Sequence, residues 1–261
     1  MDKRHESIGI KQILRYEWLE KTVNMLLAGL DEKTIRQELH EFLAMRKGNG
    51  LEEERSSQTR AFVVSNLMKT WVSPVPELIP LRNSALSLIQ QQPSIAIAVH
   101  WALISAVYPF WFNVAKQTGR LLSLQEKITS AQIISRLKEQ YGDRQTVSRY
   151  ARFVISSFVA WGVLKDLADK GCYEKTSSII ITDQKLVVLL IESALYASPE
   201  GNGVLNLLLK NPAFFPFQIP VIPSDFITQQ SCNIEVIRYG LDDELLKLTS
   251  IPPKINTEFG T

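Results

Sequence analysis

Cysteine is scarce in this chain of 261 residues, which holds only Cys172 and Cys232. The two lie 60 positions apart, form no CxxC pair and have no histidine near them in the sequence. This spacing argues against a disulfide framework and against a zinc site. The first residues lead into an amphipathic run rather than an apolar one, so we expect no signal peptide. The prediction is a cytoplasmic protein with no metal and no cofactor.

Sequence motifs of catalysis are also missing. The chain has no GxxxxGK[ST], no GxSxG, no HExxH and no GxGxxG that opens a helix after a strand. Its histidines are scattered: we expect His40 on an exposed helix face and His100 in the core with its hydrogen bonds satisfied. The acidic runs Glu52–Glu54 and Asp242–Glu244 are typical of solvated helix starts. The sequence therefore predicts a protein that is not an enzyme.

Net charge is small overall, with 29 Lys and Arg against 27 Asp and Glu, but it is unevenly distributed. Residues 55–175 carry 15 basic and 7 acidic side chains, a net charge of +8, whereas residues 1–54 and 176–261 carry −2 and −4. A basic zone of this kind indicates a surface for phosphate, although a solvated face gives the same imbalance.

One long stretch has no charge at all. No Asp, Glu, Lys or Arg occurs between Arg82 and Lys116, and Ile95–Val114 is strongly apolar. A membrane-spanning helix needs about 20 such residues. Here Pro109 would break the helix near its end, which favours a buried core helix. We predict no membrane span and assign residues 81–128 to a buried apolar helical connector, with a membrane-associated protein as an open alternative.

Residues 1–80 predict a helical N-terminal domain. Apolar residues at spacings of three and four predict a first helix over residues 7–28, which Gly29 ends. Asp31 caps a second helix, and Ser56 or Ser57 caps a third.

The start of that third helix weakly resembles a later segment of the chain. Gln58-Thr59 and Phe62-Val63-Val64-Ser65 correspond to Gln145-Thr146 and Phe153-Val154-Ile155-Ser156. The similarity gives the N-terminal domain helix-turn-helix character, although chance similarity between two amphipathic helices explains it as well. The residues of a possible second DNA-contact helix are Arg55, Ser57 and Arg60.

Residues 129–200 predict a winged helix-turn-helix. Thr129 or Ser130 caps a helix that closes at Tyr141-Gly142, and a long helix then runs from Gln145 to Trp161. After Gly162, we expect Val163–Lys165 to pair with Ser178–Thr182 as a small β-hairpin, with turn residues at Asp169-Lys170-Gly171. A further helix follows from Gln184 to Ala197.

The long helix of this unit has the pattern of a DNA-recognition helix. One face is apolar (Val147, Ala151, Val154, Ile155 and Phe158), and no acidic residue occurs between Asp143 and Asp166. Arginine can read guanine and glutamine can read adenine, although phosphate contact is as good an interpretation for each. The predicted DNA-binding residues are Arg144, Gln145, Ser148, Arg149 and Arg152 on the helix and Lys170, Tyr173 and Lys175 on the wing.

Residues 201–261 predict a Pro-rich extension that ends in a strand and a helix. Four prolines, Pro212, Pro216, Pro220 and Pro223, recur at nearly regular spacing and require extended backbone. We expect a strand around Ile234–Arg238 and a helix around Asp242–Leu248.

In this order of elements the chain resembles the BrxA family, small accessory proteins of BREX phage-defence systems. The resemblance covers residues 8–195 and is carried by three segments: Leu26-Leu27-Ala28-Gly29-Leu30-Asp31-Glu32-Lys33-Thr34-Ile35, Ile128-Thr129-Ser130-Ala131-Gln132-Ile133 and Trp161-Gly162-Val163-Leu164. It implies a compact helical, DNA-binding protein without catalysis, encoded beside larger defence enzymes. The segment from Asn211 to Pro223 has no counterpart in the family pattern.

Two hypotheses of different class follow. The first is a non-catalytic accessory protein of antiviral defence that binds duplex DNA, with other defence proteins as further partners. The second is a protein-interaction scaffold that uses the same winged-helix fold to join a multi-subunit complex.

Overall fold

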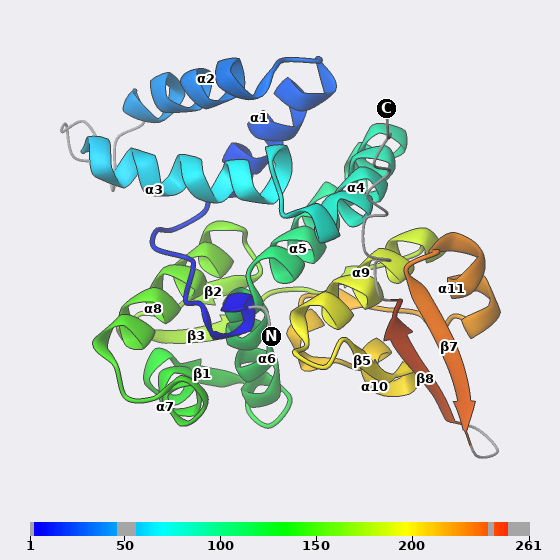
Figure 1. Cartoon of the computed structure of the whole chain (residues 1–261). Helices are drawn as coiled ribbons and strands as arrows, with labels where there is room; N and C mark the ends of the chain where they lie inside the picture. Colours follow the sequence, from blue (N-terminus) through cyan, green and yellow to red (C-terminus); the bar gives the residue numbers. More distant parts are fainter. Residues whose placement is uncertain (1–2, 46–55, 240–242, 250–261) are drawn as a thin grey trace.

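Eleven α-helices make up most of the computed structural model, which describes residues 3–45, 56–239 and 243–249 (Figure 1). In chain order they are α1 (Tyr16–Leu27), α2 (Glu32–Ala44), α3 (Ser57–Leu67), α4 (Ile79–Gln91), α5 (Ala96–Val107), α6 (Pro109–Leu122), α7 (Ser130–Tyr141), α8 (Gln145–Ala160), α9 (Gln184–Ala197), α10 (Leu205–Leu209) and α11 (Ser224–Gln230). The expectation of a mainly α-helical protein is therefore confirmed.

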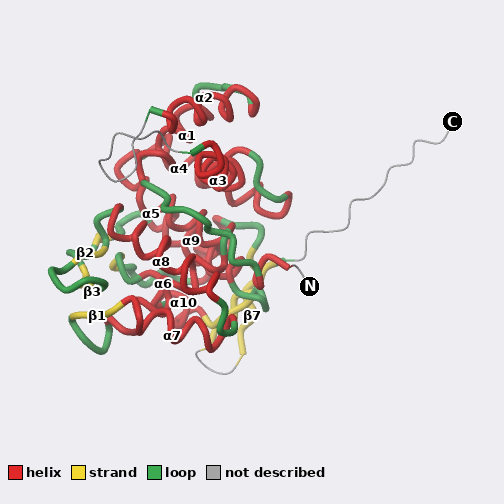
Figure 2. The backbone as a smooth tube through the Cα atoms, turned by 90° about the vertical axis from the view of Figure 1, so that its left-hand side faces the viewer, coloured by secondary structure: helices red, strands yellow, loops and turns green. Residues whose placement is uncertain are grey.

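The strands are short and form three small sheets. They are β1 (Lys127–Thr129), β2 (Leu164–Asp166), β3 (Cys172–Lys175), β4 (Ile179–Ile180), β5 (Asn202–Val204), β6 (Phe217–Gln218), β7 (Ile234–Tyr239) and β8 (Asp243–Leu248). The sheet orders are β1-β3-β2 and β5-β8-β7, both antiparallel, and a parallel pair β4-β6. Figure 2 shows the first sheet and β7 on opposite sides of the molecule, with helices between them.

The uncharged stretch forms two buried helices, as the sequence predicts. Helix α5 ends at Val107, Pro109 opens α6, and the two segments meet at a bend of 117°. Nearly every side chain of α5 is buried, and α5 packs along α9. Among the described helices none alone has the length and apolarity to cross a membrane, and this bent pair meets that test only when both halves are taken together.

Tryptophan and phenylalanine rings join these helices to α8. Trp101 of α5 and Trp111 of α6 both contact Phe158 of α8, with ring centres 4.9 Å apart in each case. Trp161, which follows α8, packs against Trp111 at 5.3 Å. Such ring pairs add to the stabilisation that burial alone provides. One hydrophobic core therefore includes residues from all four segments defined from the sequence, whose boundaries stay a prediction.

His100 lies in this core, but not as expected. The ring is fully buried among the edges of Tyr16, Trp71 and Trp161, and neither ring nitrogen has a hydrogen-bond partner in the described chain. Burial lowers the pKa of His100 to about 3, so the imidazole is neutral. The prediction of a satisfied core histidine is wrong. The aromatic neighbours offer ring edges and faces instead of hydrogen-bond acceptors. His40, expected on an exposed face, is half-buried.

The first helix is shorter than the sequence predicts. Its apolar pattern begins at residue 7, but α1 begins at Tyr16, and residues 7–15 form no helix. Ile10 and Leu14 are nevertheless fully buried. The Leu14 amide donates to the Ser157 hydroxyl at 2.9 Å, and its carbonyl accepts from the Trp161 indole at 2.9 Å. Leu14 is thus bonded to α8 and to the residue that follows α8, rather than within a helix.

The helix caps agree with the sequence. The Asp31 carboxylate accepts from the Thr34 amide at 2.9 Å, and the Ser56 hydroxyl accepts from the Thr59 amide at 3.2 Å. The acidic run Glu52–Glu54 and the candidate DNA contact Arg55 lie outside the described residues.

The predicted hairpin forms with a different partner strand. Leu164 of β2 pairs with Lys175 of β3, not with Ser178–Thr182. The turn residues 169–171 lie where expected, with Gly171 at φ 79. Strand β4, at Ile179–Ile180, pairs in parallel with β6 instead. The sequence does not indicate β3 as the partner of β2, because the β-branched run at 179–181 is the stronger strand signal. Residues 172–175 mix polar, charged and aromatic side chains.

The Pro-rich segment packs on α6, and it is only partly extended. Pro212 opens one turn of 3-10 helix, Pro212–Phe214, which corrects the prediction of extended backbone at that proline. This turn lies against α6 at Gly119, so closely that a Cβ on Gly119 would be 1.9 Å from the Pro212 carbonyl oxygen. Gly119 is thus required for the contact.

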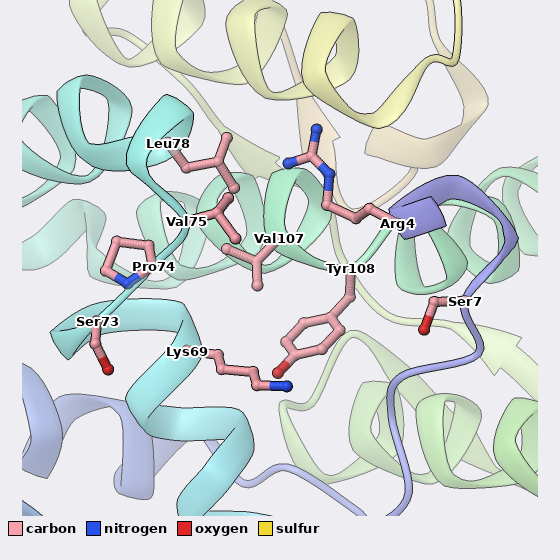
Figure 3. Close-up of a pocket in the computed structure, with 9 residues that line it drawn as sticks. All are labelled: Arg4, Ser7, Lys69, Ser73, Pro74, Val75, Leu78, Val107 and Tyr108. Atoms are coloured by element: carbon pink, nitrogen blue, oxygen red, sulfur yellow. The ribbon is translucent and has the colours of Figure 1, made fainter. Parts of the chain in front are cut away.

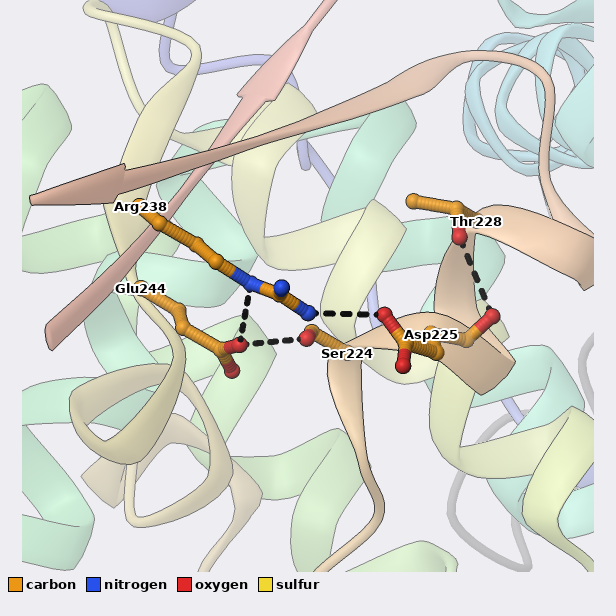
Figure 4. Close-up of polar contacts among 5 residues, drawn as sticks. All are labelled: Ser224, Asp225, Thr228, Arg238 and Glu244. Carbon is orange, nitrogen blue, oxygen red and sulfur yellow. Dashed lines mark hydrogen bonds and ion pairs between the residues drawn. The ribbon is translucent and has the colours of Figure 1, made fainter. Parts of the chain in front are cut away.

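The C-terminal region contains a second correction. The described part of the predicted helix 242–248 is a strand, β8, which pairs with β7 and β5. β7 itself lies where the sequence predicts a strand. Figure 4 shows the side-chain network that ties the hairpin to α11: Arg238 contacts Asp225 at 2.8 Å and Glu244 at 3.4 Å, and the Ser224 hydroxyl donates to Glu244. Glu244 therefore lies in a strand, and not at the start of a solvated helix.

A buried carboxylate links α9 to the C-terminal sheet. Glu192 is 4% exposed and accepts hydrogen bonds from the Ser231 hydroxyl at 2.9 Å and the Asn233 side-chain amide at 2.8 Å. Burial raises the pKa of Glu192, and the two hydrogen bonds only partly oppose this effect.

We predict that Gly119→Ala lowers the free energy of unfolding by about 1–3 kcal/mol, because the new methyl group meets backbone that cannot rotate away. The same change at an unobstructed helical glycine raises stability by about 0.5–1 kcal/mol. Urea unfolding monitored by far-UV circular dichroism gives the sign. Stabilisation by the alanine would contradict the close contact.

We predict that Glu192→Gln removes a pH dependence of stability. Because the folded-state pKa of Glu192 is raised, its contribution is fully present below the unfolded pKa and is lost as the pH rises through the folded pKa. Glutamine keeps hydrogen bonds to Ser231 and Asn233 but does not ionise. The stability of the variant relative to the wild type should therefore increase with pH above the ordinary glutamate range. Urea unfolding across a pH series measures this, and parallel curves would contradict it.

Candidate nucleic-acid interface

The candidate interface is built on the segment β1-α7-α8-β2-β3. Thr129 begins α7 with a complete capping box, in which its hydroxyl accepts from the Gln132 amide and the Gln132 side chain accepts from the Thr129 amide. Gly142, at φ 81, ends α7 and permits the sharp turn into α8. Both helix ends lie as the sequence predicts. The three strands then form one sheet in which β3 lies between β1 and β2.

The apolar face of α8 is fixed in the core. All five side chains predicted to point inward are fully buried: Val147, Ala151, Val154, Ile155 and Phe158. The prediction of this face is confirmed. Its burial sets the rotation of α8 about its axis, and so determines which side chains face away from the molecule.

The outward side chains of α8 are those that the sequence singles out. Gln145, Arg149 and Arg152 are exposed, and Ser148 is partly buried. The Arg149 guanidinium lies over the Phe153 ring, 5.8 Å from its centre. Arg144 is exposed but held, because its Nε and Nη2 donate to the Tyr141 carbonyl at 3.2 and 2.9 Å. Arg144 thus stabilises the turn between the helices.

The turn between β2 and β3 places a second group of candidates. Lys170 is exposed at the tip, Tyr173 is partly buried, and Lys175 lies opposite Leu164. Burial raises the pKa of Tyr173, Asp166 adds to this, and Arg152 acts in the opposite direction. Arg152 of α8 is therefore close enough to Tyr173 for its charge to act on the phenol.

Two of the acidic side chains near this surface are paired, whereas Asp166 and Asp169 form no ion pair in the described ranges. Asp143 forms an ion pair with Lys138 at 2.7 Å, and Glu174 forms one with Lys165 at 2.9 Å. Neutralised carboxylates repel an approaching phosphate less than free ones.

Helix α3 lies beside α8 across the N-terminal segment (Figure 1). A hollow of about 310 Å³ is lined by Lys11, Gln12, Gln58, Thr59, Phe62, Arg149 and Tyr150, and so joins all three parts. The Lys11 ammonium lies 5.0 Å from the centre of the Phe62 ring. Of the N-terminal candidates, Ser57 is exposed in the first turn of α3 and Arg60 is partly buried.

Lys11, Gln12 and Gln58 were missed as interface residues. The pattern of residues 7–28 predicts one continuous helix, which gives no reason to place Lys11 near α8. Only the docking of the extended segment through Leu14 brings Lys11 to Arg149.

A larger and more apolar pocket, of about 420 Å³, lies between the N-terminal segment, residues 69–78 and the bend between α5 and α6 (Figure 3). Val75, Leu78 and Val107 line it, and Tyr108 lies at its base, where its hydroxyl donates to the buried Asn66 side chain at 3.2 Å. Burial raises the pKa of Tyr108, which keeps the phenol protonated. The Arg4 guanidinium points away, to Glu77 at 2.9 Å.

Neither metal-binding groups nor comparisons with known proteins indicate a function. Over the described ranges no set of three or more His, Cys, Asp or Glu side chains is placed to hold a metal ion. No family model matches the chain, and no curated protein or solved structure matches it either. Function has to be inferred from the residues themselves.

Proposed function

We propose that this protein binds duplex DNA through α8 and is a non-catalytic accessory protein. The observation that carries the proposal is the outward face of α8, where Gln145, Arg149 and Arg152 are exposed on a helix without acidic side chains. The connection order β1-α7-α8-β2-β3 supports the finer interpretation of a winged helix-turn-helix. In it, α8 is the recognition helix and the β2–β3 turn is the wing.

The chemistry of the outward face suits both phosphate and bases. A guanidinium donates two parallel hydrogen bonds to guanine in the major groove, and a glutamine amide does the same with adenine. Either arginine also neutralises phosphate, which fixes the position of the duplex without reading it. Gln145, in the first turn of α8, lies at the end of the helix that enters the groove in this family of folds.

We assign the N-terminal residues to the same surface. The hollow between α3 and α8 places Lys11 and Gln58 beside Arg149, so that a duplex seated on α8 runs past the start of α3. Ser57 and Arg60 belong to that start. These residues contact the backbone rather than bases, because the hollow lies to one side of the exposed face of α8.

The resemblance to the BrxA family supplies a cellular context for the proposal: a cytoplasmic protein of phage defence that works beside larger enzymes. A protein-interaction scaffold is the second candidate. It is favoured by Ile180 of β4 and by Val221, three residues after β6, which are 68% and 78% exposed. If the scaffold is the function, the double change Ile180→Ser with Val221→Ser should abolish capture of partner proteins. Unchanged capture would contradict this second candidate.

We predict that Arg149→Ala with Arg152→Ala weakens duplex binding by at least about tenfold at low salt, because two charge-assisted contacts are lost. The plot of log affinity against log salt should also become shallower, by about 0.9 for each phosphate contact removed. Fluorescence anisotropy with a labelled duplex measures both quantities. The matched control is Lys185→Ala with Lys247→Ala, which removes the same net charge from exposed positions elsewhere. Equal losses in the two double variants would contradict the assignment to α8.

We predict that Lys11→Ala alone weakens binding several-fold and lowers the salt slope by about 0.9, the effect of one phosphate contact. The control is Lys21→Ala, since Lys21 also lies over a phenylalanine ring, 4.9 Å from the centre of Phe42, but lies away from α8. An unchanged slope in Lys11→Ala would show that the N-terminal segment does not contact the duplex, without contradicting the assignment to α8.

A further inference from the structure

A polar hollow of about 440 Å³ lies between α6, the end of α9 and the β5–α10 segment (Figure 1). Its volume is within the range of small-molecule sites, roughly 300–1,000 Å³. The hollow is separate from the candidate DNA surface, since none of the α3, α8 or wing candidates lines it. Its walls carry charged, amide and apolar side chains.

Two cations of α6 face this hollow. Lys116 and Arg120 are one helical turn apart, a spacing at which like charges destabilise a helix. No carboxylate within the described ranges lies at ion-pair distance from either. Burial lowers the pKa of Lys116, Arg120 lowers it further, and Glu200 on the rim acts in the opposite direction. An anion between the two cations would relieve their repulsion.

Gln117 adds an amide to the wall of the hollow, beside the two cations. Most of its side chain is covered, at 8% exposure, and its amide makes no hydrogen bond to another described side chain or backbone group. Neither polar atom of the amide is fully enclosed, so a ligand that enters the hollow can reach both of them. A ligand with both donors and acceptors can then pair with this amide.

The remaining walls suit a molecule with a polar body and an apolar face. Asn113 donates to the Tyr141 hydroxyl at 2.6 Å, which leaves its carbonyl oxygen to accept from a ligand. Leu207, which is 68% exposed, supplies most of the apolar surface, and Phe112 and Leu208, at 4% and 7%, add only their edges. Glu200, whose carboxylate accepts from the Ser198 hydroxyl at 2.8 Å, offers a further acceptor at the rim.

We propose that this pocket binds a nucleoside monophosphate. The phosphate lies between Lys116 and Arg120, the base packs on Leu207 and the edge of Leu208, and an edge of the base pairs with the Gln117 amide. Amide side chains pair in this bidentate manner with adenine. Glu200 accepts from ribose hydroxyls, which inorganic phosphate lacks. This site goes beyond DNA binding and does not depend on it.

Isothermal titration calorimetry of the full chain with AMP, GMP, CMP and UMP tests the proposal. We expect saturable binding of at least one of them. The matching nucleoside and inorganic phosphate should each bind at least tenfold more weakly, because each lacks one half of the contacts. Absence of saturable binding for all four overturns the proposal. Binding of inorganic phosphate as tight as that of the best nucleotide overturns it as well, and leaves a simple anion site.

Variants locate the ligand. Arg120→Ala should weaken nucleotide binding about tenfold, the usual effect of one charge-assisted contact. Gln117→Met, which keeps side-chain volume but removes the amide, should also weaken it and should reduce the preference among bases. Lys185→Ala, at the other end of α9, should leave it unchanged. Arg120 is exposed, so its loss leaves folding intact, which thermal unfolding checks. Unchanged affinity in both Arg120→Ala and Gln117→Met would place the ligand elsewhere.

Discussion

The contact of Phe158 with Trp101 and Trp111 is the interaction on which the candidate interface depends. It joins α8 to both arms of the bent α5–α6 pair, at ring-centre distances of 4.9 Å. The bend at Pro109 brings the two tryptophans to the ring of Phe158. In one straight helix they would be separated along the helix axis. With Phe158 fixed, the rotation of α8 is fixed too. Gln145, Arg149 and Arg152 then face away from the core.

The same core also determines where the N-terminal segment lies. Ser157, one residue before Phe158, bonds the Leu14 amide, and Trp161 bonds the Leu14 carbonyl. These two bonds hold the segment on α8 and place Lys11 at the hollow shared with α3. Residues separated by more than a hundred positions thus form one basic surface.

Elements with strong local signals could be predicted from the sequence. Capping residues gave the starts of α2, α3 and α7, and Gly142 and Gly162, both with positive φ, mark the breaks on either side of α8. The inward face of α8 followed from its apolar spacing. For the same reason the exposed candidates on that helix could be named in advance.

Elements determined by distant contacts could not be predicted. The amphipathic pattern of residues 7–15 is that of a helix, but the segment forms none, and Leu14 bonds instead to Ser157 of α8 and to Trp161. The β3 partner of β2 depends on β1, which lies before the two helices. Residues 243–248 have no clear alternation, and their pairing with β7 and β5 makes them a strand. Gln117 gives no signal in the sequence, because only the fold shows that its side chain lines a hollow beside two cations.

Affinity for duplex DNA as a function of salt concentration tests the central claim most directly. Wild-type protein would be titrated against random and genomic duplexes by gel retardation at several salt concentrations. Two arginines of α8 with Lys11 and Lys170 predict a linear fall of log affinity against log salt, with a slope of roughly −3 to −4. A preference for particular genomic duplexes would add base reading to backbone contact. No retardation of any duplex at the lowest salt concentration would contradict the account.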